Sequence, residues 1–109
     1  MPVELRHYIT PWGSDPYRRW LEDLRDTRGK LAILRRIDRL ENDNPGDHAL
    51  CREGVWELRI DVGPGYRVYF GKAGNAVVLL GAGDKDAQWR DLDRAIEAWQ
   101  DYKRRSRTS

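Results

Sequence analysis

The chain has 109 residues and a net charge of only +2, with 39% hydrophobic and 35% charged residues. This length suits one domain with one hydrophobic core. No apolar run reaches the roughly 18 residues that a membrane-spanning helix needs, so a helical membrane protein is excluded and no membrane partner is expected. A net charge this small does not by itself indicate a nucleic-acid partner.

Cysteine and histidine are scarce and scattered along the chain. The single cysteine, Cys51, cannot form an internal disulfide, which favours a reducing compartment and predicts a cytoplasmic protein. Two histidines and one cysteine make no ligand cluster of the usual spacing, so neither a metal nor another cofactor is expected.

Alternating apolar and polar residues over positions 3–10 predict a first strand rather than a signal peptide. His7 falls in the apolar phase, so it is expected to be a packed strand histidine and not a catalytic one. The buried face of this strand would consist of Val3, Leu5, His7 and Ile9.

Two helices are expected to follow the first strand as a helical hairpin. The first begins at Pro16, with Ser14 or Asp15 as its cap, and the second is capped by Thr27 and ends at the loop sequence NDNPGD. The apolar stripes of these helices are Tyr17, Trp20, Leu21 and Leu24, and then Ile33, Leu34, Ile37 and Leu40. The second helix would expose a solvated face of Arg28, Lys30, Arg35, Arg36 and Arg39.

From Gly54 onward the apolar period changes to two, which predicts three consecutive strands. Two strands are joined by the turn VGPG, the turn KAGN follows, and AVVLL is apolar on both faces like an interior strand. A closing helix then carries Trp89, Leu92, Ile96 and Trp99, with Ala95 and Ala98 allowing close approach. The predicted fold is α+β, in the order β-α-α-β-β-β-α, with a mostly antiparallel sheet, a helical hairpin packed on it and a closing C-terminal helix.

Five tryptophans occur, and most are expected to be core anchors rather than platforms on which bases stack. The two expected exceptions are Trp12 and Trp89.

Register parity places two arginines on the same face of the first two of these strands. Trp56, Leu58 and Ile60 must face the same core as Tyr66, Val68 and Phe70, because a one-residue slip would expose one of the sets. Arg59 and Arg67 are then opposite or diagonal to each other on the other, solvated face. Lys72 in the second turn and Lys85 after the last strand are expected to approach the same rim.

This cationic cluster has two interpretations. In the first, Glu57 and Asp61 neutralise the arginines in a cross-strand charge ladder. In the second, the cluster binds an anion, because guanidinium groups match phosphate with two hydrogen bonds and the GAGDK segment opens a helix. If the anion is RNA, cleavage by its own 2′-hydroxyl needs cations and proton-transfer groups but no metal. The acid/base candidates are Tyr69, Glu57, Tyr102 or a lysine with a lowered pKa.

Four segments, VWELR, GYRVYF, AVVLLGAGDKDAQ and RDLDRAIEAWQDYKRR, resemble the RelE/ParE toxin superfamily and within it the HigB-like addiction-module killer proteins. The resemblance covers roughly residues 3–105. It predicts a single toxin domain over residues 1–105, followed by a basic tail at residues 103–109.

The resemblance implies the toxin of a type II toxin–antitoxin system, which pairs with a small antitoxin, often of the helix-turn-helix class. Many members cleave mRNA on the ribosome without a metal. Arg67 matches a recurrent active-site position of those nucleases, Lys85 matches a second, and Arg59 matches a basic position on the preceding strand. Lys72 joins the RNA-binding set, with Lys85 and Arg59, on proximity alone. The segment DAQWRDLD departs from the pattern, since it has Trp89 where related nucleases often have Tyr or His.

Two other functions remain open. ParE-like relatives share the fold and inhibit DNA gyrase by binding, without nuclease chemistry. A third possibility is an inactive toxin that retains only its contact with the antitoxin.

Overall fold

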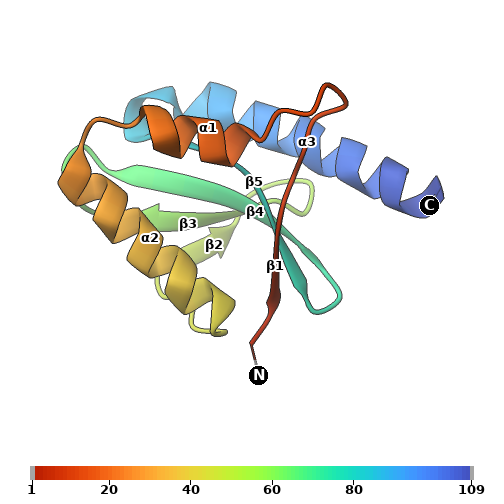
Figure 1. The fold of residues 1–109 in the computed structure, drawn as a ribbon, viewed down its shortest axis with the longest axis horizontal. Coiled ribbons are helices and arrows are strands. Elements are labelled where there is room, and N and C mark those ends of the chain that lie inside the picture. Colours follow the sequence, from red (N-terminus) through yellow and green to blue (C-terminus); the bar gives the residue numbers. More distant parts are fainter. Residues whose placement is uncertain (1, 109) are drawn as a thin grey trace.

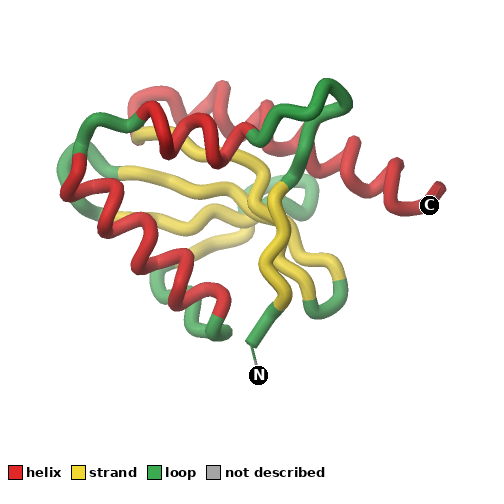
Figure 2. The backbone as a smooth tube through the Cα atoms, in the orientation of Figure 1, coloured by secondary structure: helices red, strands yellow, loops and turns green. Residues whose placement is uncertain are grey.

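The computed structural model describes residues 2–108, and its sheet has five strands in the order β1-β5-β4-β3-β2 (Figures 1 and 2). β1 pairs in parallel with β5, and the other neighbouring strands are antiparallel. The elements are β1 Glu4–His7, α1 Pro16–Asp23, α2 Thr27–Glu41, β2 His48–Leu50, β3 Trp56–Ile60, β4 Tyr66–Ala73, β5 Ala76–Asp84, the 3₁₀ helix η1 Lys85–Ala87 and α3 Gln88–Thr108. The predicted α+β class is confirmed.

Helices cover both faces of the sheet. α1 and α2 lie on one face and α3 runs behind the other, where its last turns extend past the strands (Figure 1). The core under α1 and α2 includes Ile33, Ile37, Leu58, Val68 and Phe70. The core under α3 includes Val55, Tyr69, Val78, Ala95 and Trp99. The expectation of one solvated sheet face was therefore wrong over most of its area.

The predicted order lacked one strand. β2 pairs antiparallel with β3 at the edge of the sheet, through partners such as His48 and Leu58. It has only three residues, which are too few for an alternating pattern to predict a strand after the loop that ends α2.

The first strand is confirmed, but its expected buried face was only partly right. Val3 and Leu5 pack against the α1–α2 core, whereas Ile9 is 42% exposed. β1 ends at His7, so the alternation does not continue, and Tyr8 packs under α3 with its hydroxyl donating to Asp101 at 2.7 Å. His7 lies at the sheet edge and its Nδ1 is 2.7 Å from an Asp15 carboxylate oxygen, so it is not a buried strand histidine.

The helical hairpin is confirmed, with small corrections at the caps. Asp15 caps α1 by accepting the Arg18 N–H, as one of the two predicted alternatives. The cap of α2 is Asp26 rather than Thr27, and its carboxylate accepts both the Gly29 N–H and the Tyr66 hydroxyl. Leu34 is 45% exposed and does not belong to the buried stripe, since Ile33, Ile37 and Leu40 already complete it.

α3 closes the structure as predicted. Ala95 and Ala98 are buried and let the helix approach the sheet, where Gly71 of β4 lies directly against the Trp99 ring. Trp12 and Trp89 are exposed, as expected. Residues 103–108, which were expected in the basic tail, form the last turns of α3, while residue 109 lies outside the described residues. No helix within residues 2–108 combines the length and apolarity required to span a bilayer.

A candidate anion-binding hollow

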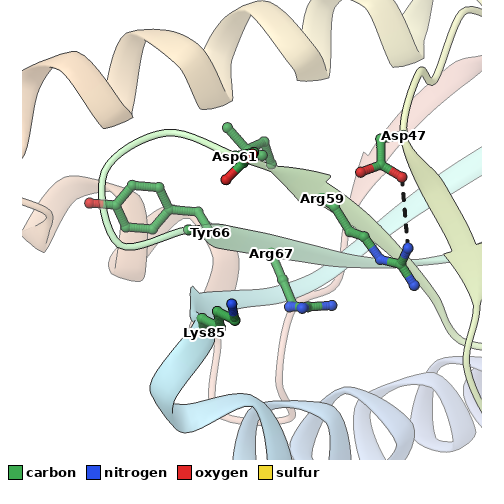
Figure 3. A pocket seen from close by; sticks show the side chains of 8 residues that line it. Asp47, Arg59, Asp61, Tyr66, Arg67 and Lys85 are labelled. Carbon is green, nitrogen blue, oxygen red and sulfur yellow. Dashed lines mark ion pairs between the residues drawn. The ribbon is translucent and has the colours of Figure 1, made fainter.

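A hollow of about 170 Å³ opens at the end of the sheet where the β3–β4 turn meets η1. Cationic side chains reach it from three segments: Arg59 from β3, Arg67 from β4 and Lys85 from the start of η1. Figure 3 shows Arg67 between the other two. The remaining lining residues are Asp47, Ile60, Asp61, Gly65 and Tyr66. The predicted convergence is therefore confirmed for three of the four cations.

One buried carboxylate holds both arginines. Arg59 and Arg67 are direct partners across the hairpin, and the Glu57 Oε1 atom accepts from Arg59 Nε at 2.8 Å and from Arg67 Nη1 at 2.7 Å. The Glu57 side chain is only 4% exposed. Burial alone would raise its pKa, but the hydrogen bonds from the two guanidinium groups outweigh burial and lower it. Glu57 therefore stays ionised and fixes the spacing of two like charges that would otherwise repel.

The charge-ladder and anion-site interpretations thus describe the same residues. Glu57 neutralises one charge from behind, and the Asp47 carboxylate lies 3.8 Å from Arg59 at the rim. The hollow is lined by three cations and two acids, and with Glu57 behind the arginines the site holds equal numbers of positive and negative groups. An anion that enters must compete with Asp47 for Arg59, whereas Arg67 presents only 17% of its side chain to solvent.

Lys85 is the third cation, and a glycine turn sets its position. Its backbone N–H donates to the Gly65 carbonyl at 3.0 Å, and Gly65 has φ +87°, a conformation that favours glycine. Within residues 2–108, no carboxylate lies within ion-pair distance of the Lys85 ammonium group. This ammonium group is consequently available to a ligand.

Arg36 of α2 organises the rim of the hollow. Its guanidinium donates to the carbonyls of Arg59, Pro45 and Asp47 at 2.5, 2.8 and 2.9 Å. It therefore fastens the loop before β2 onto β3, which corrects its assignment to a solvated helix face. Asp47 was missed as a lining residue because its approach depends on this loop and on β2.

Lys72 does not reach the hollow, which corrects the prediction made from proximity. It continues the series Tyr66, Val68 and Phe70 on the face opposite Arg67, and its ammonium lies 4.0 Å from the centre of the Trp56 ring. Lys72 is also far from Arg67 along β4, since the five positions that separate these residues span about 16 Å along a strand.

The two tyrosines proposed for proton transfer are also placed elsewhere. Tyr69 is fully buried under α3, burial raises its pKa, and its hydroxyl has no hydrogen-bond partner among the described residues. Tyr102 lies on α3 and accepts from Arg6 Nη1 at 2.7 Å. Glu57 is adjacent to the arginines, but its lowered pKa suits a positioning carboxylate better than a proton carrier.

Glu57→Gln is expected to make the free energy of unfolding depend less steeply on pH below about 4.5. The folded-state pKa of Glu57 lies below its ordinary value of 4.5, so it stabilises the fold above that pH. This stability is lost as the pH falls through the folded-state pKa. The change in slope is at most about 1.4 kcal/mol per pH unit, the contribution of one proton.

Urea titrations at a series of pH values from neutral to strongly acidic measure these slopes. Glu97→Gln removes an exposed glutamate on α3 and is the control for loss of one negative charge. Parallel pH curves for the wild type and Glu57→Gln would contradict the role given to Glu57.

Comparison with known proteins identifies one well-covered relative. An uncharacterized protein from Haemophilus influenzae (strain Rd) is 46% identical over 77 residues, which span 70% of this chain and 78% of the Haemophilus protein. No protein-family model and no solved structure matches the chain, so the RelE/ParE resemblance stays a prediction. Identity at this level over most of both sequences shows that the chain belongs to the same protein family as this Haemophilus influenzae protein.

Proposed function

We propose that the chain is the toxin of a type II toxin–antitoxin system and that it cleaves mRNA on the ribosome in the cytoplasm. The observation that carries this proposal is the hollow shared by Arg59, Arg67 and Lys85. Two of these, Arg67 and Lys85, stand at the positions to which the RelE/ParE resemblance assigns active-site roles. The proposed partner is a small helix-turn-helix antitoxin.

The proposed reaction is attack by a ribose 2′-hydroxyl on the adjacent phosphorus. The bond from phosphorus to the 5′ oxygen breaks, which leaves a 2′,3′-cyclic phosphate and a free 5′-hydroxyl. Arg59 and Arg67 would bind the non-bridging oxygens, where negative charge accumulates in the transition state. Their shared contact with Glu57 supports this role, because it orders both guanidinium groups before the substrate arrives.

Protons must leave the 2′-hydroxyl and reach the 5′ oxygen. With Tyr69 and Tyr102 placed elsewhere, the groups that line the hollow are the carboxylates of Asp47 and Asp61 and the ammonium of Lys85. We assign proton acceptance to one of the carboxylates and donation to Lys85, whose ammonium has no carboxylate within ion-pair distance among residues 2–108.

Inhibition of DNA gyrase by binding alone is the second candidate. The observation that favours it is the nearly balanced charge of the hollow, in which two carboxylates face three cations. Such a site would bind a polyanion less strongly than a purely basic one.

Controlled expression of the chain without an antitoxin tests both candidates. The nuclease proposal expects growth arrest and new 5′ ends, bearing hydroxyl groups, in ribosome-bound mRNA. Purified protein should cleave mRNA in the presence of programmed ribosomes. Intact mRNA together with inhibited supercoiling would show gyrase inhibition instead. If expression causes neither effect, the chain is an inactive toxin.

A further inference from the structure

A second, larger hollow of about 470 Å³ adjoins the anion-binding hollow. Arg59 lines both, so a group bound in one lies next to a group bound in the other. The second hollow is walled by β3, by the end of β2 with the segment after it, and by the start of α3. Its apolar walls are Leu50, Trp89 and Leu92, and its polar groups include Glu57 and Gln88.

Trp89 is 77% exposed although it is among the largest apolar side chains of the protein. An indole ring left in solvent beside a cationic hollow has the properties of a stacking platform for a planar ring. Leu50, 57% exposed, adds apolar surface to the same hollow. Stacking of one base on an aromatic ring increases the binding affinity by about tenfold to hundredfold.

The second independent observation is an unused acceptor in the same hollow. The Glu57 side chain is 4% exposed, and its Oε1 atom receives both arginines, but its Oε2 atom has no hydrogen-bond partner among the described residues. The thiol of Cys51 is near the Glu57 carboxylate but is a weak donor, and its Sγ atom donates to the Ala49 carbonyl at 4.0 Å. Burial, followed by the charge of Glu57, raises the pKa of that thiol to about 11. A buried carboxylate oxygen without a strong donor favours a ligand that brings one.

We propose that this hollow is a nucleobase subsite for a base with an exocyclic amino group. The base stacks on Trp89 and its amino group donates to the Glu57 Oε2 atom, while the adjoining phosphate lies against Arg59 in the first hollow. Adenine, cytosine and guanine present such an amino group, and carboxylates accept from cytosine in this way in known complexes. Uracil has no amino group, and its imide N–H is flanked by two carbonyl oxygens. A carboxylate repels these two oxygens. This inference rests on the proposed function, because it concerns the RNA bound at the same site.

Binding of uncleavable oligonucleotides tests the subsite separately from the nuclease chemistry. The probes are fluorescently labelled 2′-O-methyl trinucleotides whose central base is adenine, unsubstituted purine or uracil, and the readout is fluorescence anisotropy. The adenine probe should bind about tenfold or more tightly than the purine probe, which lacks only the amino group. Trp89→Ala should weaken binding of the adenine probe by about tenfold to hundredfold.

Two further variants and one control make the test specific. Trp89→Phe keeps a stacking ring and should retain most of the affinity for the adenine probe. Glu57→Gln should bind the adenine probe with a smaller preference over the purine probe than the wild type has. Trp12→Ala removes an indole that is 89% exposed in the loop after β1 and should bind like the wild type.

Equal binding of all three probes, or unchanged binding by Trp89→Ala, would overturn the subsite while leaving the nuclease proposal in place. Weaker antitoxin binding by Trp89→Ala with unchanged oligonucleotide binding would show that Trp89 serves a protein partner, which also overturns it. If no probe binds and expression causes neither growth arrest nor new 5′ ends, the proposed function and the proposed subsite are both wrong.

Discussion

Arg67→Ala is expected to lower the rate of ribosome-dependent mRNA cleavage by about 100- to 1000-fold and to abolish growth arrest. This is the usual effect of removing one group that stabilises a transition-state oxyanion. Arg67 lies between Arg59 and Lys85 and its guanidinium is held by the buried Glu57, so no neighbouring cation can take its place (Figure 3). Primer extension on ribosome-bound mRNA measures the cleavage.

The fold of Arg67→Ala should be retained, since Arg59 continues to pair with Glu57. Arg67→Lys keeps the charge without the two-pronged donor and should restore only part of the activity. Arg35→Ala removes an exposed arginine from α2 and is the control for net charge. Full toxicity of Arg67→Ala would show that the active site lies elsewhere. If Arg67→Ala is unfolded and Arg67→Lys is fully active, Arg67 has a structural role instead of a catalytic one.

Gly71→Ala is expected to reduce the free energy of unfolding by about 1–3 kcal/mol or more. A Cβ atom at this position would lie 2.5–2.6 Å from three carbon atoms of the Trp99 ring. That ring is buried and stacked against Tyr102 with a centroid distance of 5.6 Å, so it cannot move aside without disturbing the core under α3. Urea titration followed by circular dichroism measures the loss.

Gly81→Ala is the matched control. It makes the same substitution on the neighbouring strand β5, where an added Cβ would meet no atom within 4 Å and φ is not positive. Its effect should stay within about 0.5 kcal/mol. Equal losses for the two variants would mean that the contact of α3 with Gly71 is less tight than the structure indicates.

Local patterns account for most of the fold and for part of the site. The alternation on both sides of the VGPG turn was enough to predict that Arg59 and Arg67 share a face, and they are direct partners. The same alternation places Lys72 with Val68 and Phe70, so its assignment to the rim was an error of interpretation.

Other features depend on contacts between distant segments, which no local pattern contains. Tyr69 and Glu57 were expected on a solvated face, but both are buried, and Tyr69 belongs to the core under α3. The approach of Asp47 depends on Arg36, a residue of α2 whose position on the helix suggested only exposure to solvent. The unpartnered Oε2 atom of Glu57 follows from the use of Oε1 by two arginines.

The place of β5 in the sheet bears on how the chain folds during its synthesis. β5 lies between β1 and β4, and Glu4 pairs with Ala76. β1, the first strand to leave the ribosome, therefore cannot pair until β5, the last strand, has been synthesised. Contacts so distant along the chain form slowly, and domains assemble in the order of translation. A nascent chain that stops before Ala76 lacks β5, the strand that joins β1 to β4, and Lys85 completes the hollow only afterwards. On the proposed function, partial products of translation would therefore lack the complete active site and be harmless to the cell that makes them.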